Sequence, residues 1–327
     1  MAARILFVLL LVTFSFAQSE EIRTEQSSDS SDDMTIEEMQ NSEVPPPLKL
    51  EGVSDALQKA VQRKDLIEEK AGRVPFLLLP HKPNYLMPLT HQERPYNAPF
   101  ESFIGDDEWP GLSHQEAVFQ LSFKYRITDL PGNKRNKLYV AYTNKSWWQV
   151  YNSDTSRPFR ETNHEPEIMA VFNPKISFIS RAYVSLNHQS NGQYTEFSRS
   201  WNRLIFGAFH ITGNMVVGVT PWWRLPETNS ADPDDPSDND NPDIDDYMGY
   251  GEFIFVKMIG PRYFSMRLRN NLRTKNNYGA VEMEWNFPIT NRVKGFFQYF
   301  EGYGESLIEY DHYQKRIGFG FKVSDYL

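Results

Sequence analysis

A histidine, a serine and an asparagine stand at spacings that could bring them together on two neighbouring strands. The alternation of residues 181–190 predicts a strand in which His188 and Ser190 continue an apolar face. A polar turn follows, and Asn202 continues the apolar face of the next predicted strand. If these strands pair as a hairpin, the histidine could activate the serine while the amide orients the imidazole, which is the logic of a hydrolytic triad.

The elements that must position these side chains are predicted to be strands. From residue 76 onward, alternating segments recur at the spacing typical of a barrel: 84–90, 114–127, 137–151, 165–174, 181–190, 201–211, 214–224, 247–259, 262–272, 277–288, 292–302 and 306–324. About twelve strands result, an even number as single-chain bacterial barrels require. No internal apolar run reaches the ~20 residues of a spanning helix. We therefore predict an all-β fold, a transmembrane antiparallel β-barrel over residues 76–327.

Side-chain chemistry favours a membrane barrel over a soluble sandwich. In segment 281–287 large apolar residues alternate with Glu282 and Glu284, and Arg267 and Arg269 precede them by one hairpin. Facing inward, these charges could pair across a narrow polar lumen. Four tryptophans near predicted strand ends are expected to serve as interface aromatics: Trp147, Trp148, Trp222 and Trp223.

The N-terminal quarter of the sequence lacks the strand pattern of the barrel. Residues 1–17 carry a basic residue, an apolar run and a small-residue site, which predicts a secretory signal peptide cleaved after Ala17; an uncleaved anchor is the alternative. Residues 18–75 are expected to form an extension outside the barrel. Its first part is acidic and too poor in apolar residues for a core, and residues 53–71 have the apolar stripe of a short helix.

Charge and cysteine content limit the partners. The chain has 327 residues, a net charge of −9 and no cysteine. An acidic chain is a poor match for a nucleic-acid partner. A nucleophile on the lipid-facing side of a barrel would instead meet acyl chains in the membrane plane.

Five segments together resemble the outer membrane phospholipase A family over roughly residues 75–327. They are HQSNG at 188–192, SRSWNRL at 198–204, YTNKSWWQVYNSDTSRPFRETNHEP at 142–166, NDNPDIDDYMGY at 239–250 and GYGESLIEY at 302–310. The resemblance implies a calcium-dependent enzyme of the outer membrane of a Gram-negative bacterium. Such an enzyme hydrolyses acyl ester bonds of membrane phospholipids, with phospholipase A1/A2 and lysophospholipase activity, and works as a homodimer.

The resemblance also assigns roles to individual residues. His188, Ser190 and Asn202 would form the catalytic triad, and the backbone N–H of Gly192 would bind the oxyanion together with a calcium-bound water. The Ca²⁺ ligands would be the Gln193 carbonyl, the Ser198 hydroxyl and, from the opposing subunit, Ser156. A further carboxylate site maps onto Asp240; the alternative is that the acidic loop 232–246 is a solvated surface loop.

Asn144 is the candidate dimer contact. It shares a predicted strand face with Leu138, Val140, Tyr142 and Trp148, which puts an amide among lipid-facing side chains. An unpaired amide in hydrocarbon costs several kcal/mol, and a second subunit presenting the same surface would satisfy it. The family typically carries glutamine here. The alternative is that Asn144 bonds a neighbouring strand.

Two other functions remain open at this point. A non-enzymatic porin or structural barrel would share the fold, but a lumen crossed by Arg–Glu pairs leaves little room for a channel. A lipid A deacylase-like hydrolase would share both barrel and triad. The long motifs favour the phospholipase.

Overall fold

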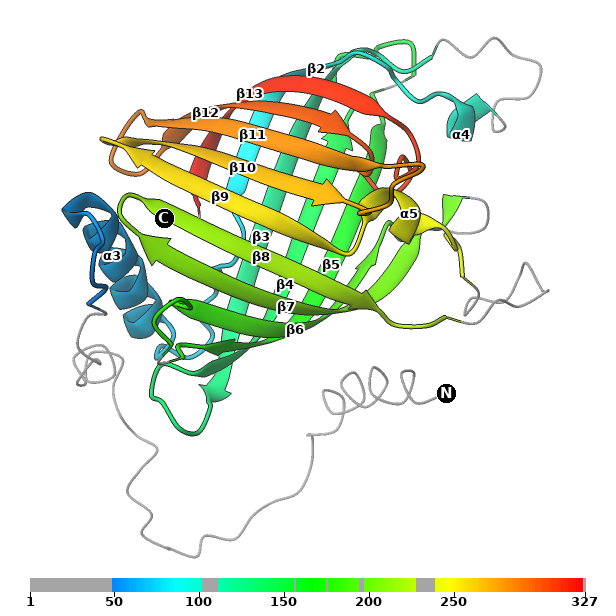
Figure 1. Ribbon diagram of the computed structural model, residues 1–327. Coiled ribbons are helices and arrows are strands. Elements are labelled where there is room, and N and C mark those ends of the chain that lie inside the picture. Colours follow the sequence, from blue (N-terminus) through cyan, green and yellow to red (C-terminus); the bar gives the residue numbers. More distant parts are fainter. Residues whose placement is uncertain are drawn as a thin grey trace, which may run out of the picture. The chain divides into compact units, whose positions relative to one another are not determined.

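The computed structural model describes residues 49–101, 111–155, 157–174, 176–193, 197–227 and 239–325. Twelve antiparallel strands, β2 to β13, form one sheet in which β2 pairs with β13 and β3 pairs with β4, so the sheet closes into a barrel (Figure 1). The predicted all-β barrel is confirmed. The predicted signal peptide and the acidic segment that follows it lie outside the described residues, as does Ser156.

The strands of the barrel have the following bounds: β2 Asn84–Gln92, β3 Gln115–Asp129, β4 Lys137–Trp148, β5 Phe159–Phe172, β6 Arg181–Ser190, β7 Ser200–Thr212, β8 Met215–Arg224, β9 Gly251–Ile259, β10 Arg262–Asn270, β11 Gly279–Pro288, β12 Lys294–Gly302 and β13 Gln314–Ser324. A two-residue strand, β1 (Leu79–Pro80), pairs with β3. Three helices complete the described chain: α3 Asp55–Ala71, α4 Ala98–Glu101 and α5 Ile244–Met248. None of them is both long and apolar enough to cross a membrane.

Three predicted strands have a bound that differs from the observed one by four residues or more. β5 begins six residues before the predicted start at 165, because Phe159 and the polar run 160–164 belong to the strand. The segment 306–313 is not strand, since residues 306–310 fold into the barrel as a buried loop before β13. The first residues of the predicted strand 247–259 are the end of α5.

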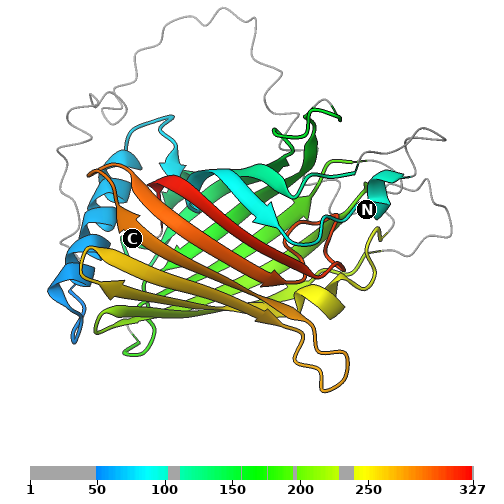
Figure 2. The same cartoon turned by 90° about the horizontal axis from the view of Figure 1, so that it is seen from above.

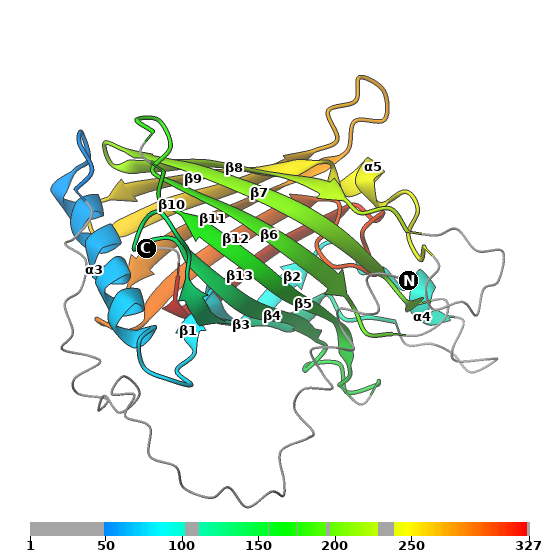
Figure 3. The same ribbon diagram turned by 90° about the horizontal axis from the view of Figure 1, so that it is seen from below.

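The two ends of the barrel differ (Figure 3). We call the end with the connections β7–β8 and β9–β10 the turn end, since these connections are only two residues long. The opposite end, the loop end, carries α4, α5 and the segment 303–313. α3 lies at the turn end, and α5 at the loop end (Figures 1 and 2).

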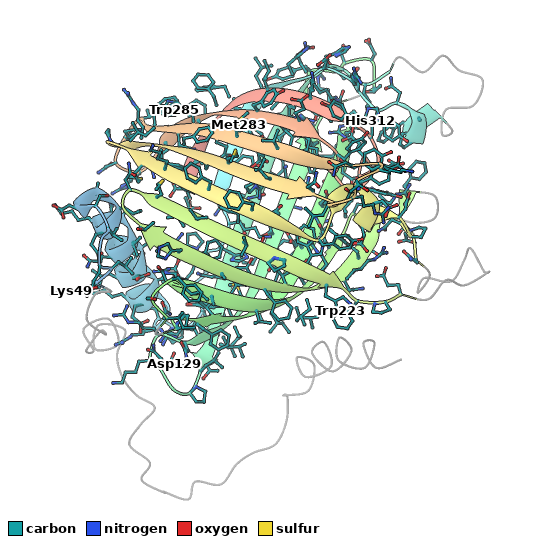
Figure 4. The ribbon with its side chains drawn as sticks, in the orientation of Figure 1. Lys49, Asp129, Trp223, Met283, Trp285 and His312 are labelled. Atoms are coloured by element: carbon teal, nitrogen blue, oxygen red, sulfur yellow. The ribbon has the colours of Figure 1, made fainter. Side chains whose placement is uncertain are left out.

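Alternation sorts apolar residues outward and polar residues inward. The outer surface exposes a broad set of large apolar side chains: Leu86, Leu89, Leu121, Phe123, Ile168, Leu186, Phe206, Val219, Phe253, Leu268, Phe297, Ile317 and Phe321. Met283 and Trp285 of β11 alternate with the carboxylates of the lumen (Figure 4). This is the pattern of a wall between hydrocarbon and a polar interior.

Only one of the two predicted Arg–Glu pairs forms. Arg267 lies opposite Glu282, and their charged atoms are 2.9 Å apart. Glu284 instead pairs with Lys322 at 2.5 Å. Arg269 lies opposite Ala280, so its guanidinium donates to the carbonyl oxygens of residues 303 and 304. The second predicted pair was wrong because β11 places Ala280, not Glu284, opposite Arg269; the carboxylate opposite Arg269 is Glu252 of β9.

Two of the four tryptophans predicted to be interface aromatics lie inside the barrel. Neighbouring residues in a strand point to opposite faces. Trp147 and Trp222 are 1% and 7% exposed and lie inside, whereas Trp223 is 59% exposed on the outer surface (Figure 4). Trp148 also lies outside, where it stacks on Phe159 with ring centroids 5.4 Å apart.

Buried ion pairs fill the lumen near the loop end. The carboxylate of Glu116 lies 3.0 Å from Arg160 and 2.6 Å from Arg316. Each of these arginines also binds a carboxylate of the folded-in loop, Glu309 at 2.6 Å and Glu305 at 2.5 Å. Part of the motif at 302–310 therefore supplies counter-charges to the barrel interior. A cavity of about 420 Å³ remains in the lumen.

The predicted helix over residues 53–71 is confirmed as α3, and it packs on the turn end of the barrel. Leu57 and Val61 are buried against Ile211 at the end of β7. Lys124 of β3 pairs with Glu68 at 2.8 Å, and Arg181 of β6 pairs with Asp65. Burial raises the pKa of the Glu68 carboxyl, but Lys124, Lys64 and Arg181 together outweigh this and hold the pKa below its usual range.

We expect Leu57→Ala to release α3 from the barrel. Truncating a fully buried leucine costs about 2–5 kcal/mol, which is much of what one helix can gain by docking. Ile67→Ala, on the exposed face of the same helix, is the matched control. Hydrogen exchange of the α3 amides should rise strongly in the first variant and little in the second, while strand amides stay protected. Equal protection in both variants would contradict this docking.

Candidate active site

The β6–β7 hairpin brings the predicted triad residues to one surface. His188 lies directly opposite Asn202 across the hairpin, and Ser190 lies opposite Ser200. Their face is the outer one, since Leu186 is 43% exposed on it whereas Ser185 and Asn187 are buried in the lumen. The predicted faces and hairpin are therefore present, and the three side chains lie at the loop end of the outer wall.

The histidine and the asparagine are joined by a hydrogen bond. The Nδ1–H of His188 donates to Oδ1 of Asn202 at 2.9 Å. Ser190 lies two residues further along the same strand face. Among the described residues no hydrogen bond joins Ser190 Oγ to the His188 ring. Such bonds are often long in free enzymes and tighten when substrate is bound.

Asn202 has a second partner that the sequence analysis missed. Its Nδ2 amide donates to Oε1 of Glu227 at 2.9 Å, and Arg224 donates to the other carboxylate oxygen at 3.0 Å. Glu227 belongs to the loop after β8, 25 residues from Asn202. No periodicity or motif pointed to it, because loop geometry alone brings it to the hairpin.

Arg224 also connects the triad to the acidic loop. Its guanidinium donates to Asn239 Oδ1 at 2.6 Å and to the Pro242 carbonyl at 3.3 Å, and it lies 3.9 Å from Asp245. Burial raises the pKa of the Asp245 carboxyl, although Arg224 opposes this.

Gly192 follows the serine with a left-handed backbone. Its φ of +65° is a conformation that favours glycine. A β-carbon added there would lie 3.7 Å from Nε2 of His164, which is the cross-strand partner of Ser190. The other ring nitrogen of His164 bonds the Tyr142 hydroxyl at 2.6 Å. His164 was also missed, although it lies within the segment 142–166 that carries the family resemblance.

Two of the predicted calcium ligands lie in contact. The Ser198 hydroxyl donates to Asp240 Oδ2 at 2.6 Å, and Ser200 donates to the same oxygen at 3.4 Å. Oδ1 of Asn191 accepts from the backbone N–H of Gln193 and of Arg199, which ties both sides of the β6–β7 turn together. Among the described residues, no group of three or more His, Cys, Asp or Glu side chains is arranged so that it could hold a metal ion. The side-chain atoms that do meet at Asp240 are oxygens, which are the ligand atoms that calcium prefers.

Asn144 lies on the outer face of β4, opposite Leu121 of β3 and His164 of β5. Its Oδ1 accepts a hydrogen bond from Ser146 Oγ at 3.1 Å. Ser146 belongs to the same strand as Asn144, so this hydrogen bond is not the bond to a neighbouring strand that the alternative predicted. Its Nδ2 has no hydrogen-bond partner in the part of the chain that the structure describes.

Known proteins resemble this chain in both sequence and fold. A family profile described as phospholipase A1 matches residues 61–323. The chain is 35% identical to phospholipase A1 of Klebsiella pneumoniae over 256 residues, covering 77% of this chain and 84% of that protein. The phospholipase A1 of Escherichia coli strain K12 is also 35% identical, with 83% of its length covered.

Solved structures agree with this assignment. Outer membrane phospholipase A from Escherichia coli superposes with a TM-score of 0.68 at 33% identity, covering 77% of this chain and all of that one. The outer membrane phospholipase of Salmonella typhi, solved as a dimer with bound calcium, gives the same score and identity and is covered over 94% of its length. The porin and lipid A deacylase alternatives are thereby set aside. The chain belongs to the phospholipase A1 family and is an outer-membrane β-barrel phospholipase.

Proposed function

We propose that Ser190, His188 and Asn202 hydrolyse acyl ester bonds of phospholipids that reach the outer wall of the barrel from the membrane plane. The observation that carries the proposal is the hydrogen bond from His188 Nδ1 to Asn202, on a lipid-facing surface that also bears Ser190. With Nδ1 protonated, the opposite ring nitrogen Nε2 is free to act as a base. The signal at residues 1–17, cleaved after Ala17, would direct the chain to export.

The reaction would follow the double displacement of serine hydrolases. Ser190 Oγ attacks the ester carbonyl while His188 Nε2 takes its proton, and the backbone N–H of Gly192 stabilises the oxyanion. His188 then protonates the departing lysophospholipid oxygen, which leaves the acyl chain on Ser190. Water, activated by the same histidine, releases the fatty acid.

Calcium fits the oxygens gathered beside the β6–β7 turn. The Salmonella typhi relative was solved with bound calcium. Here the Ser198 hydroxyl, the Asp240 carboxylate and the Gln193 carbonyl would hold the ion. When bound, calcium supplies positive charge that stabilises a developing oxyanion. Ser156 of a second subunit is the remaining predicted ligand.

A homodimer would complete the site. The Salmonella typhi relative was solved as a dimer. In this chain Asn144 presents an amide N–H₂ on the lipid-facing wall, where an unpaired donor is costly. A twofold contact through β4 would pair it and would bring the partner's Ser156 to the calcium site.

We expect Ser190→Ala to abolish phospholipid hydrolysis while the protein still folds as a heat-modifiable barrel. His188→Ala should lower the rate of hydrolysis by a similar factor. Asn202→Ala should lower it less, because Asn202 orients the base and does not itself take the proton. Hydrolysis of a labelled phospholipid in mixed micelles measures all three. Near-wild-type turnover by Ser190→Ala would rule out this nucleophile.

Hydrolysis should stop when calcium is removed by a chelator, and the barrel should remain folded. Magnesium should restore little of it, since that ion demands tighter octahedral geometry and gives up water reluctantly. Asp240→Asn should raise the calcium concentration that gives half-maximal rate. Undiminished turnover in excess chelator would contradict the metal assignment.

Dimerisation should govern the rate. Asn144→Leu removes the polar group that the partner would satisfy, so we expect more monomer and a lower rate at equal protein concentration. Leu268→Ile, on the outer face of β10 at the opposite side of the barrel from β4, is the matched control. Crosslinking in detergent followed by an assay of each species tests this, and full activity from isolated monomer would exclude the mechanism.

A further inference from the structure

We propose that Glu227 is a positioning residue that fixes which end of the Asn202 amide faces His188, and through it the tautomer of the histidine. The proposal rests on the triad proposed above. It adds a fourth side chain, from the loop after β8, whose hydrogen bond to Asn202 is 2.9 Å long.

A neutral amide in the third position of a triad has an ambiguity that a carboxylate lacks. Its oxygen and nitrogen ends have nearly the same shape, so the side chain could present either one to the histidine. If Nδ2 faced His188, it would donate to Nδ1 and leave the proton on Nε2. That nitrogen must instead accept the serine proton, so the flipped amide would hold the base in the wrong tautomer.

Glu227 removes this ambiguity because an ionised carboxylate only accepts hydrogen bonds. Asn202 must therefore turn its Nδ2 toward Glu227, which leaves Oδ1 to accept from His188 at 2.9 Å. The two bonds together allow one orientation of the amide.

Arg224 holds the carboxylate in place. It binds the oxygen of Glu227 that Asn202 does not use, so each carboxylate oxygen has its own partner. The Glu227 and Arg224 side chains are only 13% and 11% exposed, so solvent screens the pair less than it would at an open surface. Arg224 is itself anchored by Asn239 and by the Pro242 carbonyl.

The carboxylate also offsets a weakness of an amide triad. During the reaction His188 becomes positively charged, and a neutral amide stabilises that charge less than an aspartate does. A hydrogen bond from Nδ2 to a carboxylate polarises the amide and makes its oxygen a stronger acceptor. Glu227 thus contributes part of the negative charge that Asn202 lacks.

The first test measures kcat and KM of Glu227→Ala and Glu227→Gln. We expect kcat to fall about tenfold with KM nearly unchanged, because Asn202 loses its hydrogen bond to a charged group, whereas no contact with the substrate changes. Glu301→Gln is the matched control, since its carboxylate also lies at the loop end of the barrel and bonds Tyr299 and Tyr313, away from the triad. Unchanged kcat in both Glu227 variants would overturn the proposal.

In the second test, Glu227→Gln should change kcat in opposite directions in two backgrounds. A loss of loop structure would lower kcat in both. Asn202→Asp places a second carboxylate against Glu227, and their repulsion should displace the new group. Adding Glu227→Gln should then raise kcat about tenfold, because the glutamine amide can donate to the introduced carboxylate, whereas the same substitution lowers kcat beside Asn202. A fall in both backgrounds would show that Glu227 acts only on loop stability.

Two further comparisons separate this proposal from the triad itself. In an Asn202→Ala protein, Glu227→Ala should cause no additional loss, since the residue it acts through is gone. Ser190→Ala reports on the nucleophile alone. An inactive Ser190→Ala protein together with Glu227 variants of full activity would overturn the role of Glu227 and leave the triad standing.

Discussion

The structure depends on pairing every backbone N–H and C=O group of the wall within the sheet. Hydrocarbon offers these groups no partners, so a sheet in a membrane must close on itself. The β13–β2 and β3–β4 pairings provide that closure. Once the sheet is closed, the register of each hairpin decides which side chains meet lipid. The pairing of His188 with Asn202 is thus set by backbone hydrogen bonds before any catalytic contact forms.

Charges in the lumen obey a second constraint, because each must have a partner nearby. Glu116 lies between Arg160 and Arg316, and the loop after β12 brings Glu305 and Glu309 to the same arginines. This network ties β3, β5 and β13 to one loop. The motif at 302–310, which contributed to the family resemblance, therefore has a structural role inside the barrel. Its carboxylates lie in the lumen, whereas the triad lies on the outer wall.

Much of the fold could be predicted because consecutive residues of a strand alternate between the two faces of the barrel wall, so the face of each residue follows from the local sequence. The β6 and β7 segments were placed to within a residue, and His188, Ser190 and Asn202 were assigned to one face from period two alone. Predictions failed where the outcome depends on residues far apart in the sequence. Arg269 does not pair with Glu284 because the cross-strand register places Ala280 of β11 opposite it, and residues 306–310 are buried as a loop in which Glu309 pairs with Arg160 of β5. Glu227 escaped notice for the same reason, since its contact with Asn202 joins a strand to a loop.

The position of the β6–β7 site on the outer wall also determines how the enzyme encounters its substrate. With Ser190 as the proposed nucleophile, phospholipid would reach it by lateral diffusion within a leaflet, so the collision rate would depend on molecules per unit area and not per unit volume. Diluting phospholipid with an inert amphiphile lowers the rate even when the bulk concentration of phospholipid is constant. Adding more vesicles of fixed composition leaves the rate of a membrane-embedded enzyme unchanged. Turnover is therefore a measure of the mole fraction of phospholipid in the leaflet that surrounds the barrel.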